Sequence, residues 1–80
     1  MLTIDEELDV RGMNCPMPII RTRQSLKQLS MGQHLKIIAT DPGTVRDFEA
    51  LCGHTGNQLV ASDREKGEYI FIIKKNVEDK

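Results

Sequence analysis

Charged and apolar side chains alternate along residues 7–12, where Leu8 and Val10 occupy every second position. A period of two residues is typical of a strand that buries one face. Apolar stretches predict three further strands, at residues 34–40, 57–62 and 68–75. In the first of these, Leu35, Ile37 and Ala39 occupy alternate positions and should share one face of the sheet. The polar segment 63–67, which ends in a glycine, is expected to form a hairpin loop between the last two strands.

The segment between the first two strands follows a helical period instead. Within residues 16–29, Ile19, Leu26 and Leu29 fall on one stripe, and Thr22 occupies the turn that lacks an apolar residue. Charged and amide side chains lie away from the centre of this stripe. This spacing predicts an amphipathic helix that packs one side against the sheet.

A second helix is expected after residue 43. Thr44 can cap its start, with Asp47 three residues later as a short version of the capping-box partner. Cys52 falls on the apolar stripe of this helix. The helix should end at Gly53 or Gly56, and the pattern does not decide between them.

The predicted order of elements is strand, helix, strand, helix, strand, strand. Each strand–helix–strand unit should cross over with the same hand, which places both helices on one face of the sheet. The last strand returns antiparallel through the hairpin. The sequence therefore predicts an α/β fold: a two-layer sandwich with a mixed four-stranded sheet. With 80 residues, we expect a single domain over 1–80, with an ordered core at about 5–75.

Composition excludes several classes of function. The net charge is −1 and the pI is about 6.1, so no general basic field attracts nucleic acid or an anionic membrane. Only three aromatic residues are present, too few for a base-stacking platform. The first residues resemble no secretory signal, and no apolar run has membrane-spanning length. We expect a cytoplasmic monomer with reduced thiols.

Cys15 lies in the expected turn between the first strand and the first helix. Chemistry in open α/β sheets gathers at the carboxyl ends of parallel strands. The start of a helix also offers unpaired N–H groups and a partial positive charge, which stabilise a thiolate. We therefore expect the pKa of Cys15 to lie below that of a free cysteine. The alternative is an inert cysteine at an ordinary helix boundary.

Two prolines, Pro16 and Pro18, follow this cysteine closely. Proline fits the first turn of a helix because its missing N–H would have no helical partner there. The helix is expected to start at Pro16, or at Pro18 if the extended preference of Met17 prevails. In both cases the two rings should limit the directions open to the Cys15 sulfur and aim it outward.

The stretch LDVRGMNCPMP, residues 8–18, resembles the Cys-Pro-X-Pro signature of the TusA family of sulfur-carrier proteins, also called SirA-like. The later segments DPGTVRDFEALC and NQLVAS are also similar to that family, so the resemblance extends from Leu8 to Lys75. It implies the predicted two-layer sandwich, similar to the C-terminal domain of a translation initiation factor. It also implies that Cys15 carries a persulfide, with Pro16 and Pro18 as supporting motif residues.

The resemblance further implies a set of partners and no metal or organic cofactor. A sulfur-donor protein, such as a cysteine desulfurase or a rhodanese-like protein, would load Cys15, and an acceptor relay protein would unload it. This is thiol exchange chemistry. Family members serve transfer-RNA thiolation, sulfur oxidation, selenium handling, molybdenum-cofactor supply or thiosulfate uptake, and the sequence does not choose among these pathways.

Other residues could assist docking or tune the thiol. Asp41 ends the second strand on the edge expected for Cys15, although a turn residue before a proline is the simpler interpretation. As a carboxylate near the thiol, it would raise the thiol pKa. Four cations could form a basic docking surface or simply a solvated helix face: Arg11, Arg21, Arg23 and Lys27.

The remaining cysteine and the histidines favour structural roles. Cys52 is expected to be packed in the core, with a resolving thiol for Cys15 as the weaker idea. His34 and His54 do not form a paired metal-ligand motif with the cysteines, so no metal site is predicted. The alternative function is a non-catalytic interaction or regulatory domain with a structural Cys15. A thiol peroxidase or disulfide reductase is weaker, because no Cys-X-X-Cys pair is present.

Overall fold

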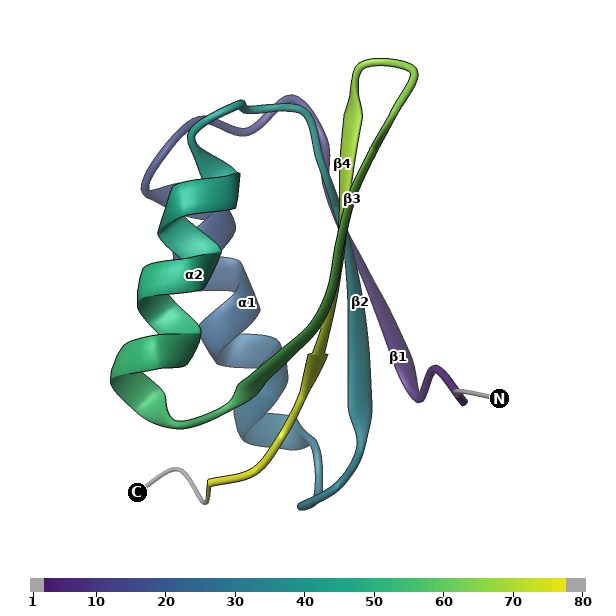
Figure 1. The fold of residues 1–80 in the computed structure, drawn as a ribbon, viewed down its shortest axis with the longest axis vertical. Helices are drawn as coiled ribbons and strands as arrows, with labels where there is room; N and C mark the ends of the chain where they lie inside the picture. Colours follow the sequence, from purple (N-terminus) through teal and green to yellow (C-terminus); the bar gives the residue numbers. More distant parts are fainter. Residues whose placement is uncertain (1–2, 78–80) are drawn as a thin grey trace.

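Two helices cover one face of a four-stranded sheet in the computed structural model, which describes residues 3–77 (Figure 1). The elements are, in chain order, β1 (Glu6–Val10), α1 (Met17–Gln28), β2 (His34–Ala39), α2 (Thr44–Thr55), β3 (Gln58–Glu65) and β4 (Glu68–Lys74). This order and the two-layer arrangement confirm the predicted α/β sandwich.

The strands lie in the order β1-β2-β4-β3. β1 pairs with β2 in parallel, and β4 runs antiparallel to both β2 and β3. The last residues of β1 and β2, Val10 and Ala39, are directly opposite each other. The loops that follow these two strands therefore leave the sheet side by side, at the edge where α/β folds gather their chemistry.

The core lies between the helices and the sheet. In β2, alternate residues Leu35, Ile37 and Ala39 are fully buried, as the period of two predicted. The rings of Phe48 in α2 and Phe71 in β4 lie 4.6 Å apart in a tilted arrangement that aromatic pairs favour. The apolar core as a whole consists of Val10, Leu26, Leu29, Leu35, Ile37, Ala39, Phe48, Cys52, Phe71 and Ile73.

α1 begins at Met17, so neither predicted start, Pro16 or Pro18, is the first helical residue. Pro16 is the cap residue before the helix, and the N–H of Met17 donates to the carbonyl of Asn14 at 3.0 Å. The Pro18 side chain is fully buried on the same stripe as Thr22. This burial holds the first turn helical against the extended preference of a residue that precedes proline.

The predicted capping role of Thr44 is wrong. Thr44 is the first residue of α2, after Gly43 as cap, and its hydroxyl donates to the carbonyl of Asp41 at 2.7 Å. The side chain points back into the preceding loop because Thr44 is fully buried there. Of the two glycines proposed to end the helix, Gly56 does so, with a left-handed φ of 91° that suits glycine.

The hairpin loop is shorter than the predicted segment 63–67. β3 continues to Glu65, and only Lys66 and Gly67 turn the chain, with φ values of 49° and 80°. A two-residue turn with both φ values positive matches the twist of paired strands. The polar residues before Lys66 look like a loop in the sequence, but they pair with β4 as an exposed strand at the sheet edge.

A buried lysine binds the C-terminal end of α1. Lys75 follows β4 and is only 4% exposed. Its ammonium donates to the carbonyls of Leu26 and Leu29 at 2.6 and 2.8 Å. These carbonyls belong to the last turn of the helix, where cations interact favourably with unpaired acceptors and the helix dipole. The cation thereby joins α1 to the end of the sheet.

We expect Lys75→Met to lower the free energy of unfolding by about 1–2 kcal/mol, because it removes two charge-assisted hydrogen bonds and leaves their buried carbonyl acceptors less satisfied. Urea unfolding at neutral pH measures the change. Lys74→Met is the matched control, since Lys74 is the adjacent half-buried lysine on the strand. An unchanged or raised stability in Lys75→Met would show that the capping contact contributes nothing.

Candidate functional site

Cys15 is exposed in the loop between β1 and α1, two residues before the helix begins. Its backbone N–H donates to a carboxylate oxygen of Asp41, Oδ2, at 3.1 Å. Asp41 lies in the loop that follows β2. The structure therefore brings together Cys15 and Asp41, as the sequence placed them on one edge of the sheet, and joins them through the main chain of the cysteine.

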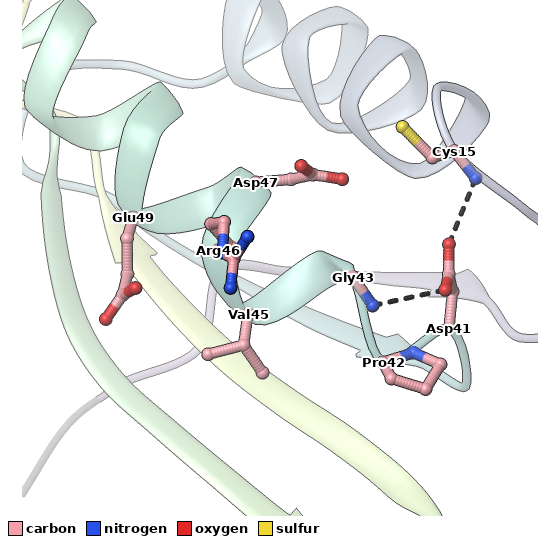
Figure 2. A pocket seen from close by; sticks show the side chains of 8 residues that line it. All are labelled: Cys15, Asp41, Pro42, Gly43, Val45, Arg46, Asp47 and Glu49. Carbon is pink, nitrogen blue, oxygen red and sulfur yellow. Dashed lines mark hydrogen bonds between the residues drawn. The ribbon is translucent and has the colours of Figure 1, made fainter.

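Asp41 also organises its own loop. Its second carboxylate oxygen, Oδ1, accepts a hydrogen bond from the N–H of Gly43 at 3.1 Å, and its carbonyl accepts from the N–H of Thr44 at 3.0 Å (Figure 2). One side chain thus holds both the start of α2 and the loop that carries Cys15. The turn-residue interpretation of Asp41 is therefore correct but incomplete.

A second contact joins the same two loops. The N–H of Gly12 donates to the Thr40 hydroxyl oxygen at 2.8 Å, across the ends of β1 and β2. Gly12 has a left-handed φ of 79°, which lets the chain turn immediately after the strand. The path of the cysteine loop is consequently fixed at two positions by the neighbouring loop.

The pKa of Cys15 is raised, which contradicts the lowered pKa expected from its place at a helix start. The main cause is hydrogen bonding with the Asp47 carboxylate, followed by loss of solvation and the negative charges of Asp47 and Asp41. The helix start offers little compensation, because Pro18 has no N–H and the Met17 N–H is already bonded to Asn14. The resting thiol is therefore favoured in its neutral form.

Asp47 is a site residue that the sequence pattern assigned to helix capping. It lies in the first turn of α2, and Figure 2 shows its carboxylate directed toward Cys15. No side-chain hydrogen bond caps this helix, so the predicted capping role of Asp47 is wrong. The signal in the sequence was its position six residues after Asp41, which places both carboxylates at the same end of α2.

Two hollows meet at Cys15 and Asp47. The larger, with a volume of about 710 Å³, contains four charged side chains and is lined by Cys15, Asp41, Pro42, Gly43, Val45, Arg46, Asp47 and Glu49 (Figure 2). The smaller, of about 330 Å³, lies between the two helices and is lined by Cys15, Pro16, Ile19, Asp47, Ala50, Leu51 and His54. The sulfur is thus accessible from both a charged and an apolar surface.

The candidate basic residues do not gather around the thiol. The Arg11 guanidinium is held by Asp9 at 2.8 Å and by Glu68 at 3.1 Å, near the β3–β4 hairpin. Arg23 and Lys27 lie together on exposed α1 beside Ile20. The fourth cation, Arg21, lines a separate hollow between α1 and β1.

Cys52 is buried in α2, and burial raises the pKa of its thiol to about 11. Core packing is therefore confirmed as its environment, and both cysteines are free thiols. Within residues 3–77, no cluster of three or more histidine, cysteine, aspartate or glutamate side chains could hold a metal ion. Neither helix in that part of the chain is long and apolar enough to cross a membrane.

We expect Asp41→Ala to release both loops while the sheet stays intact, because it removes the acceptor of the Cys15 and Gly43 N–H groups. The free energy of unfolding should fall by about 1–2 kcal/mol. Amide hydrogen exchange at Cys15 and Gly43 should accelerate. Asp63→Ala, which removes an exposed carboxylate from β3, is the control. Unchanged exchange at Cys15 and Gly43 would mean that Asp41 does not hold the loops.

The family model described as "Sulfurtransferase TusA" matches residues 6–75. The "Sulfur carrier protein TusA" of Allochromatium vinosum is 50% identical over 76 residues, which cover 95% of this chain and 100% of that protein. The protein of the same name from Pseudomonas syringae is 43% identical over 74 residues, which cover 92% of this chain and 88% of that protein.

A solved structure shows the same fold at lower sequence similarity. The crystal structure of a SirA-like protein from Desulfitobacterium hafniense matches with a TM-score of 0.78 at 19% identity, over 90% of this chain and 99% of that chain. Because the family model spans all six elements and the relatives match over nearly their full length, the chain belongs to the TusA family of sulfur carrier proteins.

Proposed function

We propose that Cys15 is the sulfur-carrying residue of this protein, which accepts sulfur as a persulfide and passes it to a second protein. The observation that carries the proposal is the exposure of the Cys15 thiol at the meeting point of two hollows, while Cys52 is buried in the core. A carrier sulfur must be reached by two different partners in turn. Of the two cysteines, Cys15 has the access that such a relay needs.

Sulfur moves by exchange between a thiol and a persulfide. The sulfur of Cys15 attacks the outer sulfur of a persulfide on a donor cysteine, the S–S bond of the donor breaks, and the donor keeps a thiol. The same exchange in the opposite sense delivers the outer sulfur to an acceptor thiol. No oxidant, reductant, metal or organic cofactor enters the balance, because one S–S bond replaces another. A docked partner supplies the orientation.

The proposed partners are proteins. A cysteine desulfurase or a rhodanese-like protein fits the donor, and a relay protein of a cytosolic pathway such as transfer-RNA thiolation fits the acceptor. The exposed surface of α1, separate from the two hollows at Cys15, carries Ile20, Arg23 and Lys27, an apolar side chain with two cations. Such a surface suits a partner with acidic residues around its active site, since charge steers docking. The carboxylate of Asp41 and the cations Arg11 and Arg21 remain candidates for docking.

The alternative of a non-catalytic interaction domain requires a structural Cys15. Its side chain is exposed and contributes nothing to the core, so nothing in its packing explains a cysteine at this position. The loop is held instead by the backbone N–H of Cys15, a contact that other residues could make equally well. Sulfur transfer therefore accounts for the thiol better than a structural role does.

Incubation with a cysteine desulfurase and free cysteine should add one sulfur atom to the wild-type chain, and a reductant should remove it. Intact-mass measurement follows the change. Cys15→Ser should gain no sulfur, whereas Cys52→Ala, the matched control for the buried thiol, should load as the wild type does. Equal loading of Cys15→Ser and the wild type would exclude Cys15 as the carrier.

A further inference from the structure

A carboxylate faces the thiol of the proposed carrier cysteine. Asp47 lies in the first turn of α2, on the helix across the hollow from Cys15, and its side chain extends toward the cysteine (Figure 2). The Asp47 carboxylate also has the largest influence on the ionisation of Cys15, whose pKa it raises. Asp47 and Cys15 are also the two residues shared by both hollows.

The other charged groups around the thiol are placed differently. Both carboxylate oxygens of Asp41 already accept backbone hydrogen bonds, from Cys15 and Gly43. Glu49 and Arg46 line the larger hollow, and Glu49 points away from the cysteine (Figure 2). His54 lines the smaller hollow, nearly two helical turns from Asp47. Of these charged groups, Asp47 is therefore the one directed toward the Cys15 side chain (Figure 2).

We propose that Asp47 is the proton acceptor for Cys15 during sulfur loading, an inference that rests on the proposed carrier role of Cys15. The thiol proton passes to the Asp47 carboxylate as the sulfur forms a bond to the outer sulfur of the donor persulfide. The donor S–S bond breaks, and its electron pair stays on the donor cysteine sulfur. The proton on Asp47 then passes to that sulfur, which restores the carboxylate and leaves a donor thiol.

A base beside Cys15 would explain how a thiol with a raised pKa can act as a nucleophile. Only a thiolate, or a thiol that loses its proton during attack, is a good nucleophile, yet the carboxylates around Cys15 disfavour the free thiolate. A base that faces the thiol removes the proton without releasing a thiolate beside two negative charges. The neutral thiol would also protect the unloaded carrier from small electrophiles and oxidants, since these react with the thiolate.

Two rates measured side by side test the role of Asp47. The first is alkylation of Cys15 by iodoacetamide, an uncharged reagent, across a range of pH. The second is single-turnover transfer of sulfur from glutathione persulfide to Cys15, followed by intact mass, which needs no partner protein. Asp47→Asn keeps the size of the side chain and removes its charge and basicity. Glu49→Gln removes the same charge from the same helix without facing the thiol, and is the matched control.

Asp47→Asn should change the two rates in opposite directions. Alkylation at neutral pH should accelerate, with its midpoint at lower pH, whereas sulfur transfer should slow by about tenfold or more, because general-base assistance is lost. Glu49→Gln should leave both rates within about twofold of the wild type, and Asp47→Glu should recover part of the transfer rate. Thermal melting identifies any variant that is not folded, and Asp47→Ser then replaces it, since serine is favoured near a helix start.

Two results would overturn the inference. Transfer by Asp47→Asn at or above the wild-type rate would show that the carboxylate only suppresses the thiolate and takes no proton. Unchanged alkylation together with unchanged transfer would show that Asp47 does not act on the thiol. A wild-type chain that takes up no sulfur at Cys15 would refute the carrier role itself, a failure that is separate from either result.

Discussion

The Asp41 carboxylate is the contact on which the geometry of the site depends. Its two oxygens bind backbone N–H groups from two different loops, one on Cys15 and one on Gly43. Parallel pairing of β1 and β2 brings these loops together, because Val10 and Ala39 end their strands opposite each other. The sheet therefore brings the two loops close together, and the Asp41 carboxylate fixes the backbone of Cys15.

Asp41, together with Asp47, also affects the ionisation of the Cys15 thiol. A cysteine before a helix would ordinarily be expected to ionise more readily, but here the prolines remove donors from the helix start while Asp47 and Asp41 disfavour the negative charge. The result is an exposed thiol that is held largely neutral. Such a residue would react slowly by itself and would depend on correct placement against a persulfide, which suits a carrier that should exchange sulfur only with its partners.

The architecture could be predicted from the sequence because it depends on periodicity. Alternation at Leu35, Ile37 and Ala39 indicated a strand with one buried face, and the Cys-Pro-X-Pro motif indicated both the family and the residue that we propose as the sulfur carrier. The position of Asp41 beside the cysteine also followed from the predicted parallel strands. These features are local in the sequence, or need only one pairing between elements.

Features that depend on contacts between distant residues could not be predicted. Asp47 looks like a capping residue until α2 is placed opposite the cysteine loop, and the ionisation of Cys15 was misjudged for the same reason. Lys75 looks like an exposed lysine after an apolar strand, yet it reaches the end of α1 and is buried there. In each case the decisive partner lies on another element, so the role of the residue follows only when the two elements are placed together.

The raised pKa of Cys15, beside the carboxylates of Asp47 and Asp41, is the central feature of this site, and it can be measured in the wild-type chain alone. Nuclear magnetic resonance of the Cys15 Cβ carbon, followed across pH, reports the ionisation of this thiol directly. The expected midpoint lies above that of a cysteine in an unfolded peptide of the same sequence, because Asp47 and Asp41 disfavour the thiolate. A midpoint at or below the peptide value would contradict the arrangement of carboxylates described for Cys15.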